Sequence, residues 1–194
     1  MALRMNIGCG THLISGWVNM DVAPGAPGVV PGDVLAIPCA SGAAEAVILF
    51  DVIEHLHPRR EVPVALAEVF RVLTPGGVLR VSTPDLAVLA KAYVEGRVGK
   101  TGVASQPGWY SEAPAALQFS AHCFGNNSEN TPTGIYDGHQ ALWDEEALGG
   151  ALRNAGFRDT RKQWPGESLS EGIRLTVADR WPETSLIMEG RRWA

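Results

Sequence analysis

A glycine-rich turn and several acids near the start of the chain have the types and spacing of a ligand-binding site. The turn is Asn6-Ile7-Gly8-Cys9-Gly10, where two glycines let the chain bend sharply and let a ligand approach the bare backbone. Asp21 follows soon after, and its ionised carboxylate can accept hydrogen bonds from both hydroxyls of a ribose. Asp33 heads a later loop, and Asp51 ends an apolar run. The pattern predicts a pocket for a ligand that carries a sugar diol.

Three histidines are the other candidates for chemistry. His55 follows Glu54, and a helix start explains this pair equally well, because an acid is favourable at the N-terminal end of a helix dipole. His122 and His139 lie much later, where each either contacts a substrate or packs at the surface. Cys123 beside His122 raises a metal site or a Cys-His nucleophile, but the cysteine and histidine spacings match no metal template. We therefore predict no metal.

Short apolar runs and amphipathic segments must position these residues. Strands are predicted at residues 3–7, 17–20, 29–30, 46–50, 78–81, 157–164 and 184–189. Helices are predicted at residues 59–73, with Pro63 near the first turn, at residues 85–95, with Asp85 as N-cap, and at residues 143–154, ended by Gly156.

This alternation predicts an α/β fold with a doubly wound, mostly parallel, seven-stranded sheet. The last two strands are joined by a short connection without a clear helix, so the last strand is predicted to be antiparallel. In open α/β sheets the ligand lies outside the carboxyl ends of the strands. Gly8, Asp21 and Asp51 all fall at such ends.

Residues 96–140 differ from the rest of the chain. They are rich in Gly, Pro, Ser and Asn, show no long periodic segment, and include the aromatic residues Trp109, Tyr110, Phe119, Phe124 and Tyr136. Long irregular segments of this kind often have a functional role. We predict that residues 96–140 are an irregular insert or lid over the active site, within one domain that spans residues 1–194.

Composition restricts the class of protein. A chain of 194 residues fits one domain with one core, and a net charge of −5 argues against a nucleic-acid partner. The longest apolar run contains Glu45 and Asp51, so it cannot span a membrane. Cys9, Cys39 and Cys123 have no CxxC spacing, and the first strand leaves no room for a signal peptide. These features predict a cytoplasmic protein with reduced thiols.

Five segments, in order, resemble the class I S-adenosylmethionine-dependent methyltransferases, in particular the group called methyltransferase type 11. They cover roughly residues 3–85, and the segment 146–157 is similar to the last helix of the family and the start of the strand after it. The five are Asn6-Ile7-Gly8-Cys9-Gly10, Trp17-Val18-Asn19-Met20-Asp21, Asp33-Val34-Leu35-Ala36-Ile37-Pro38, Asp51-Val52-Ile53-Glu54-His55-Leu56 and Leu73-Thr74-Pro75-Gly76-Gly77-Val78-Leu79. The resemblance implies a Rossmann-like domain, methyltransferase activity, S-adenosylmethionine as cofactor and a small-molecule acceptor.

The resemblance also implies roles for individual residues. Backbone amides from Gly8 to Gly10 would meet the methionine end of the cofactor, and Asp21 would hold its ribose. Asp33 would accept from the adenine amino group, with the amide of Val34 or Leu35 on the ring, and Asp51 and its neighbours would line the sulfonium side. The cofactor-binding residues that it implies are Asn6, Gly8, Cys9, Gly10, Asp21, Asp33, Val34, Leu35 and Asp51.

The chain departs from the family pattern between the glycine turn and the ribose acid. Gly10 and Asp21 are about ten residues apart, against roughly 20 in a dinucleotide fingerprint. The helix after the first strand is therefore predicted to be shortened or replaced by residues 11–16. A shorter helix has a weaker N-terminal anion site, so we expect Thr11 and His12 to add cofactor contacts.

Alternative functions remain at this point. A non-catalytic module that binds the cofactor, or serves as a partner subunit, would keep the same fold. A nicotinamide-dependent oxidoreductase is disfavoured because Gly8-Cys9-Gly10-Thr11-His12-Leu13 lacks the third glycine of that fingerprint. Methyl transfer needs a base only if the acceptor must lose a proton, and then His55, His122 and His139 are the candidates. The sequence leaves the acceptor and the oligomeric state open.

Overall fold

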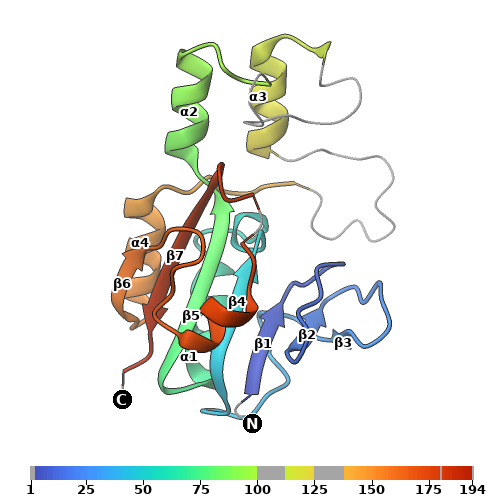
Figure 1. The fold of residues 1–194 in the computed structure, drawn as a ribbon, viewed down its shortest axis with the longest axis vertical. Helices are drawn as coiled ribbons and strands as arrows, with labels where there is room; N and C mark the ends of the chain where they lie inside the picture. Colours follow the sequence, from blue (N-terminus) through green and yellow to red (C-terminus); the bar gives the residue numbers. More distant parts are fainter. Residues whose placement is uncertain (1–2, 100–111, 125–137, 180, 194) are drawn as a thin grey trace.

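The computed structural model describes residues 3–99, 112–124, 138–179 and 181–193 (Figure 1). Its centre is one sheet of seven strands in the order β3-β2-β1-β4-β5-β7-β6. The strands β1 to β5 pair in parallel, and β7 runs antiparallel to its neighbours β5 and β6. The strands are β1 (Leu3–Ile7), β2 (Val18–Asp21), β3 (Val30–Pro31), β4 (Ala44–Phe50), β5 (Leu73–Pro84), β6 (Arg158–Lys162) and β7 (Ser185–Arg191). The predicted fold class, with its antiparallel last strand, is confirmed.

The strand β5 begins earlier than predicted. It follows directly on helix α1 (Val62–Val72), so residues 74–77 form the first part of the strand instead of a turn before it. The reason lies in the segment after β7. Gly76 donates a backbone hydrogen bond to the Arg192 carbonyl at 2.7 Å, and Arg192 donates to the Gly77 carbonyl at 2.9 Å, which extends the ladder across the glycines.

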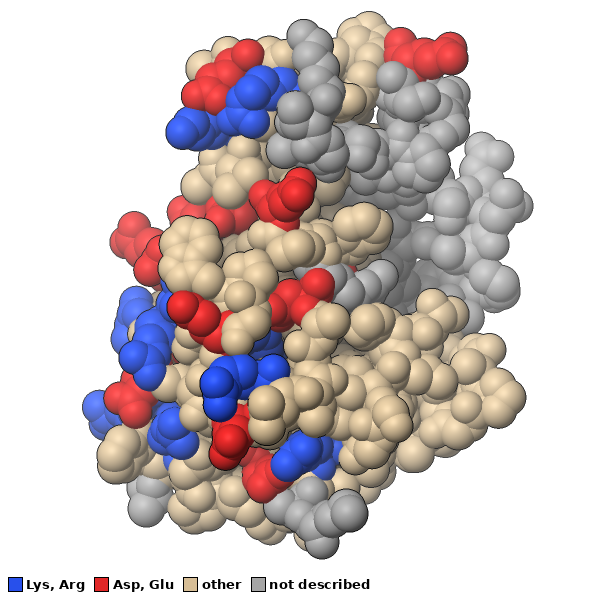
Figure 2. Space-filling view, viewed as in Figure 1, with Lys and Arg blue, Asp and Glu red and all other residues tan. Residues whose placement is uncertain are grey.

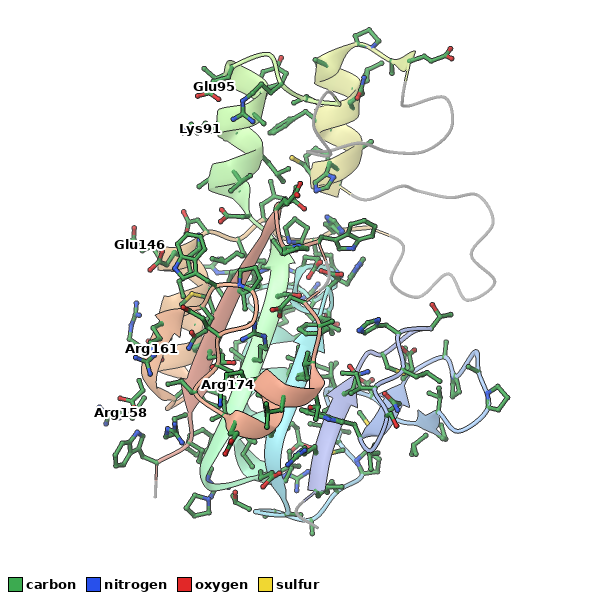
Figure 3. All side chains as sticks on the ribbon, viewed as in Figure 1. Lys91, Glu95, Glu146, Arg158, Arg161 and Arg174 are labelled. Carbon is green, nitrogen blue, oxygen red and sulfur yellow. The ribbon has the colours of Figure 1, made fainter. Side chains whose placement is uncertain are left out.

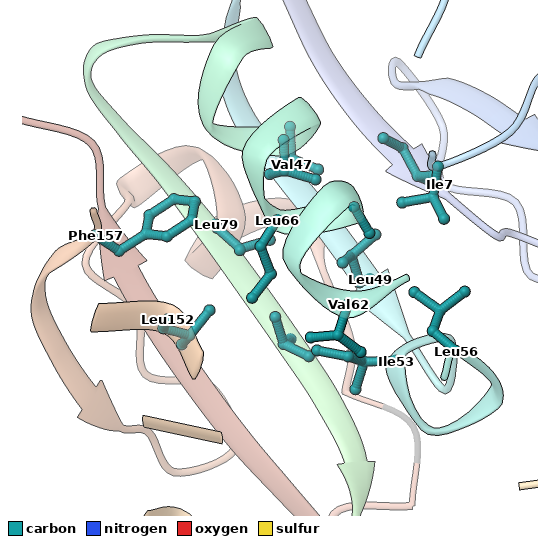
Figure 4. Close-up of a cluster of buried hydrophobic side chains, with 14 of the residues drawn as sticks. Ile7, Val47, Leu49, Ile53, Leu56, Val62, Leu66, Leu79, Leu152 and Phe157 are labelled. Atoms are coloured by element: carbon teal, nitrogen blue, oxygen red, sulfur yellow. The ribbon is translucent and has the colours of Figure 1, made fainter. Parts of the chain in front are cut away.

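One face of the sheet carries the main core, shown in Figure 4. The helices α1 and α4 (Glu145–Asn154) cover this face. Pro63 lies in the first turn of α1, and the Asp144 carboxylate caps α4 by accepting from the Ala147 amide at 2.8 Å. The buried side chains labelled in Figure 4 are Ile7, Val47, Leu49, Ile53, Leu56, Val62, Leu66, Leu79, Leu152 and Phe157.

The opposite face has a thinner cover. Residues 8–17 contain no helix, which confirms the predicted replacement of the first helix by a loop. Ile14 and Trp17 of this loop pack against the other side of β4, together with Ile173 of the short helix α5 (Glu171–Thr176). The Trp17 indole donates to the Thr176 hydroxyl at 3.1 Å, so loop and α5 hold each other in place.

Two helices, α2 (Leu86–Val94) and α3 (Ala115–Phe124), project beyond the carboxyl ends of the strands (Figure 1). Lys91 and Glu95 extend from α2 on the side away from α3, as Figure 3 shows. The two helices meet through Tyr93 and Phe119, whose ring centroids lie 5.0 Å apart.

The helix α3 differs from the expectation that residues 96–140 hold no long periodic segment. Its alanine-rich sequence has high intrinsic helix propensity, and contact with α2 supplies the packing that a weakly amphipathic helix needs. Trp109, Tyr110 and Tyr136 lie outside the described residues. The role of this segment as a lid stays a prediction.

Asp85 connects β5 to α2, and we expect its replacement to separate two effects. Its Oδ1 accepts from the Ala87 and Val88 amides at 2.9 and 3.4 Å, and its Oδ2 accepts from Lys162 Nζ at 3.1 Å. Asp85→Ala removes cap and ion pair together and should lower the free energy of unfolding by about 1–2 kcal/mol. Asp85→Asn keeps the cap and should lose less than half of that amount, measured by urea denaturation. Equal losses in both variants would show that the cap contributes nothing.

Charges of both signs are mixed on the visible face of the molecule. Figure 2 shows Lys and Arg interspersed with Asp and Glu over β5 to β7, whereas the surface over β1 to β3 is mostly uncharged. Among the described residues, no helix is both long enough and apolar enough to cross a membrane.

Candidate functional site

A pocket of about 190 Å³ lies at the carboxyl ends of β1, β2 and β4. Four of the predicted site residues come from separate segments of the chain and line it together: Gly8, Asp21, Asp33 and Asp51. The complete lining is Ile7, Gly8, Asp21, Val22, Gly32, Asp33, Val34, Asp51, Val52, His55 and Leu56. The pocket therefore combines three carboxylates with an apolar wall.

Gly8 occupies a position that only glycine fits. Its φ is +69°, in the left-handed region, and a Cβ atom built on it would lie 2.4 Å from Val52 Cγ2. Any larger residue would clash with Val52 or push it into the pocket. The bare backbone of Gly8 thus forms part of the pocket wall, as the sequence predicted.

The amides of the glycine turn are engaged within the protein. Gly8 and Cys9 donate to the Met20 carbonyl at 2.8 and 3.1 Å, and Gly10 donates to Asp21 Oδ2 at 2.7 Å. The short connection explains this: with no helix after β1, the turn folds back onto β2 and uses its donors there. That these amides meet the methionine end of a cofactor stays a prediction.

Asp21 joins the turn to the pocket. Its Oδ2 accepts from Gly10 and its Oδ1 accepts from the Ala23 amide at 2.9 Å. A carboxylate offers about four lone-pair positions, so each oxygen can accept one more hydrogen bond from a ligand. The two backbone bonds fix the orientation of the carboxylate in advance, which is favourable for recognition of a diol.

Asp33 and its neighbours form a second side of the pocket. The Asp33 Oδ1 accepts from the Leu35 amide at 2.9 Å, which folds the loop into a turn. Gly32 is required beside it, because a Cβ atom there would lie 2.5 Å from Met20 Sδ. Val34 lines the pocket, whereas Leu35 is not among the lining residues. Its amide, one of the two predicted to contact a base, is bonded to Asp33.

Asp51 has an unusual backbone conformation. It ends β4 with a φ of +54°, and its amide donates to the Ser82 carbonyl at 3.1 Å. A non-glycine residue in this region costs on the order of 1–3 kcal/mol, and such residues concentrate at functional sites. Asp51 lines the pocket together with Val52.

Asn6, Cys9 and Gly10, also predicted to bind the cofactor, do not line the pocket. Asn6 is 1% exposed, and its side-chain amide donates to the His12 carbonyl at 2.8 Å and to Asn19 Oδ1 at 2.9 Å. Burial, with a smaller effect from the Asp21 charge, raises the pKa of the Cys9 thiol. Asn6, Cys9 and Gly10 therefore stabilise the glycine turn without lining the pocket.

Thr11 and His12 are likewise absent from the pocket lining. The His12 ring faces Phe50, with ring centroids 6.1 Å apart. The expectation that these two residues bind the cofactor in place of the missing first helix therefore has no support in the geometry of the described pocket.

The structure brings the predicted histidines together. His55 lines the pocket, and its ring meets that of His139 edge to face, with centroids 4.9 Å apart. Burial lowers the pKa of His139 to about 4, and the nearby charges of His55 and His122 act in the same direction. Burial also lowers the pKa of His122 and raises the pKa of the Cys123 thiol, which disfavours the thiolate form of Cys123.

The sequence identified Val34 and the neighbours of Asp51, but it missed other residues of the apolar wall. Val22 directly follows Asp21, and Leu56 ends the same segment as His55. Its position directly after a strand-end acid was a signal that could have identified Val22, because ligand pockets are lined mainly by apolar side chains with a few polar groups.

The topology and this site can be compared with known proteins. Residues 17–81 match the model of a methyltransferase domain family. Two solved S-adenosylmethionine-dependent methyltransferases share the fold. The one from Thermotoga maritima, described as a possible histamine N-methyltransferase, is 15% identical, with a TM-score of 0.56, 99% of this chain and 83% of that chain covered. The one from Methanosarcina mazei is 14% identical, with a TM-score of 0.53. The alignment covers 98% of this chain and 92% of that chain.

These structures share the fold of this chain, and the family model matches about a third of its length. No curated protein sequence matches it significantly. The family match begins at Trp17, after the glycine turn. The unmatched residues before Trp17 include the loop that stands where the sequence pattern of the family places a first helix.

Proposed function

We propose that this protein is an S-adenosylmethionine-dependent methyltransferase that acts on a small-molecule acceptor. The observation that carries the proposal is the convergence of Gly8, Asp21, Asp33 and Asp51 on one pocket. A glycine wall, an oriented acid for a ribose and a second acid for an adenine amino group fit the nucleoside part of this cofactor. The pocket is smaller than the roughly 300–1,000 Å³ of typical ligand sites, so we assign it to the nucleoside.

The side chains have distinct roles in the proposal. Asp21 accepts from the ribose hydroxyls through the lone pairs that Gly10 and Ala23 leave open. Asp33 accepts from the adenine amino group, and Val22 and Val34 pack against the base. Asp51 lies on the side of the sulfonium, where a negative charge favours a cation.

The acceptor is expected to approach from the side of His55, which borders the pocket and contacts His139. The cofactor supplies a methyl group on a sulfonium, and this group moves to the acceptor by in-line displacement. The protein aligns the reactants and excludes water, which can lower the barrier by roughly 7–11 kcal/mol. The helices α2 and α3 project beyond the same ends of the strands, in a position to contribute to this enclosure (Figure 1).

Isothermal titration tests the proposal directly. We expect S-adenosylhomocysteine, the product form of the cofactor, to bind with one site per chain, and NAD to show no comparable binding. Turnover with an acceptor panel then separates an enzyme from a non-catalytic module. Absence of S-adenosylhomocysteine binding, or tighter binding of NAD, would overturn the proposal.

Asp21→Asn should weaken S-adenosylhomocysteine binding by about tenfold or more, because hydrogen bonds to a charged group contribute about 1.5–3 kcal/mol. Asparagine keeps the shape and can still accept from the Gly10 amide, but its NH2 group cannot accept from the Ala23 amide, so thermal denaturation is measured beside the affinity. The matched control is Asp144→Asn at the N-cap of α4, where asparagine caps as well as aspartate. The control should bind S-adenosylhomocysteine as tightly as the wild type does. If the wild type, Asp21→Asn and Asp144→Asn all had the same affinity, the proposed role of Asp21 would be contradicted.

The alternative is a subunit that binds the cofactor but turns over only with a partner. Among the solved structures of the same fold is a complex of the Haloferax volcanii Trm112 methyltransferase activator with a putative methyltransferase, 13% identical with a TM-score of 0.51. Cofactor binding without methylation of any acceptor by the isolated chain would favour this alternative.

The free state of all three cysteines agrees with the proposed cytoplasmic location.

A further inference from the structure

Three side chains at the border of the pocket form a compact cluster of potential metal ligands. Glu54, His55 and His139 each offer one ligand atom, and these atoms all lie within 4.8 Å of one another. Glu54 is 1% exposed, and both histidines are partly buried. Glu54 and His55 come from the turn η1 (Ile53–His55) at the end of β4, whereas His139 is 84 residues further along the chain.

The backbone near His139 holds the cluster together. The Gln140 and Ala141 amides donate to the Glu54 carbonyl at 2.7 and 3.2 Å, and the Gln140 side chain donates to the His55 carbonyl at 2.9 Å. The His139 amide donates to the Phe124 carbonyl at 2.9 Å. His139 is thus fixed against the end of β4 by hydrogen bonds that do not involve its ring.

The ring of His139 is oriented as in a metal ligand. Its Nδ1 lies 3.1 Å from the Cys123 carbonyl oxygen, which can only accept, so Nδ1 carries the proton. In the neutral ring Nε2 then keeps its lone pair. A histidine that binds a metal commonly donates its other N–H to a carbonyl in this way, which fixes tautomer and orientation.

We propose that Glu54, His55 and His139 form a binding site for a divalent transition-metal cation at the acceptor side of the pocket. Two imidazoles with one carboxylate suit Zn²⁺, Fe²⁺, Co²⁺ or Mn²⁺, whereas Mg²⁺ and Ca²⁺ prefer oxygen ligands throughout. Zn²⁺ holds nitrogen and oxygen ligands at about 2.0–2.2 Å in a tetrahedron, which places ligand atoms about 3.4 Å apart, so atoms that now lie up to 4.8 Å apart must approach one another by roughly 1 Å. Three protein ligands leave a coordination position open.

The open position suggests what the cation does, and this step rests on the proposed function. His55 lines both the cluster and the pocket, so a bound hydroxyl would lie close to the methyl donor. A cation lowers the pKa of a coordinated hydroxyl. The hydroxyl proton passes to solvent, the oxygen bonds to the methyl carbon, and the electron pair of the broken carbon–sulfur bond stays on sulfur. The acceptor class is therefore a hydroxyl compound.

Metal titration of chelator-treated protein tests the site without any assay of activity. We expect one Zn²⁺ per chain by isothermal titration, and weak or no binding of Mg²⁺. Co²⁺ should give visible absorption bands typical of nitrogen and oxygen ligands. At free Zn²⁺ about 100 times the dissociation constant, the melting temperature should rise by about 5–10 °C. Zn²⁺ binding that is absent, or no tighter than that of Mg²⁺, would overturn the site.

Changes in residues that only hydrogen-bond to metal ligands weaken metal binding by roughly 10–100-fold. The variants His139→Ala and Glu54→Gln remove ligands themselves and should weaken Zn²⁺ binding by more than that. The matched control is His57→Asn, a nearby histidine whose Nδ1 accepts from the Arg59 amide, a bond that asparagine can keep. The control should bind Zn²⁺ as the wild type does. Because Glu54 is buried, each variant is also checked by circular dichroism and by S-adenosylhomocysteine affinity, which should be retained. Zn²⁺ affinity unchanged in folded His139→Ala would overturn the assignment.

The results separate this inference from the proposed function. S-adenosylhomocysteine binding with no Zn²⁺ site overturns the inference alone, and a Zn²⁺ site without S-adenosylhomocysteine binding overturns the proposed function alone. In the acceptor panel, EDTA should stop methylation of hydroxyl compounds. Methylation that proceeds equally with and without EDTA would overturn the role of the cation in catalysis.

Discussion

Gly8→Ala is expected to weaken S-adenosylhomocysteine binding about 100-fold, equivalent to about 2.7 kcal/mol. Alanine in the left-handed region costs about 1–2 kcal/mol. The new Cβ would also lie 2.4 Å from Val52 Cγ2, so either the turn or Val52 must move, and both form the pocket wall. Isothermal titration measures the affinity, and thermal denaturation measures the loss of stability.

Gly42→Ala is the matched control for the backbone effect. Gly42 has a φ of +67°, close to that of Gly8, but a Cβ atom there would meet nothing within 4 Å, and Gly42 lies outside the pocket. This variant should lose about 1 kcal/mol of stability and keep its affinity for S-adenosylhomocysteine. If Gly8→Ala also kept its affinity for S-adenosylhomocysteine, the close approach of Gly8 to Val52 would not matter for binding.

A double-mutant cycle with Val52→Ala sharpens the test. The smaller side chain removes the Cγ atoms that clash, so Gly8→Ala combined with Val52→Ala should regain much of the affinity. Residues in direct contact are expected to be non-additive in this way. Strict additivity of the two changes would indicate that the turn fails for a reason other than the clash.

Arg80→Met is expected to have the largest effect on stability. Arg80 is 1% exposed, and its guanidinium donates to both oxygens of Asp179 at 2.7–2.9 Å and to Glu189 Oε1 at 2.7 Å. It also donates to the Glu167 carbonyl at 2.9 Å. Removing the cation leaves two buried carboxylates without it, which costs about 3–5 kcal/mol.

The same network fastens the segment that covers the thinner face of the sheet. Glu189 of β7 also accepts from the Ser168 hydroxyl and the Leu169 amide, both at 2.6 Å. Asp179 lies beyond α5, so Arg80 holds the segment at both ends. Loss of Arg80 should therefore increase hydrogen exchange in residues 163–179 before the remaining sheet is affected.

Urea and thermal denaturation measure the Arg80→Met effect. A loss of 3–5 kcal/mol corresponds to about 6–20 °C in melting temperature for a protein of this size. Arg174→Met is the control, because Arg174 projects from the exposed side of α5 (Figure 3) and lies 3.8 Å from Glu171 in a solvent-exposed pair. The control should change stability by less than about 1 kcal/mol. A similar small change in Arg80→Met would contradict the role of the buried network.

Local patterns predicted much of the site. Gly8, Asp21 and Asp51 were identified because each ends an apolar run, and parallel strands place their carboxyl ends at the same edge. The third acid, Asp33, joins them in the pocket. The engagement of the glycine-turn amides was not predictable in this way, because it depends on how closely the turn folds against β2.

Contacts between distant segments were the least predictable. Arg80 in a strand pattern resembles a solvent-facing residue, and its partners Asp179 and Glu189 are 99 and 109 positions away. His139 lies in a segment without periodicity, so no local signal associates it with Glu54 and His55. The helix α3 also lacked a clear pattern, because packing against α2 stabilises it more than its own amphipathicity does.

The sequence by itself determined the order of the seven strands and of the helices α1, α2 and α4, the glycine turn and the acids at the pocket, because hydrophobic periodicity and residue type act locally. The tertiary structure decided which amides of the turn remain available, which residues form the apolar wall, and that a histidine from beyond α3 meets the end of β4. Those features depend on the distances between segments far apart in the chain, and only the packing of the whole sheet sets such distances.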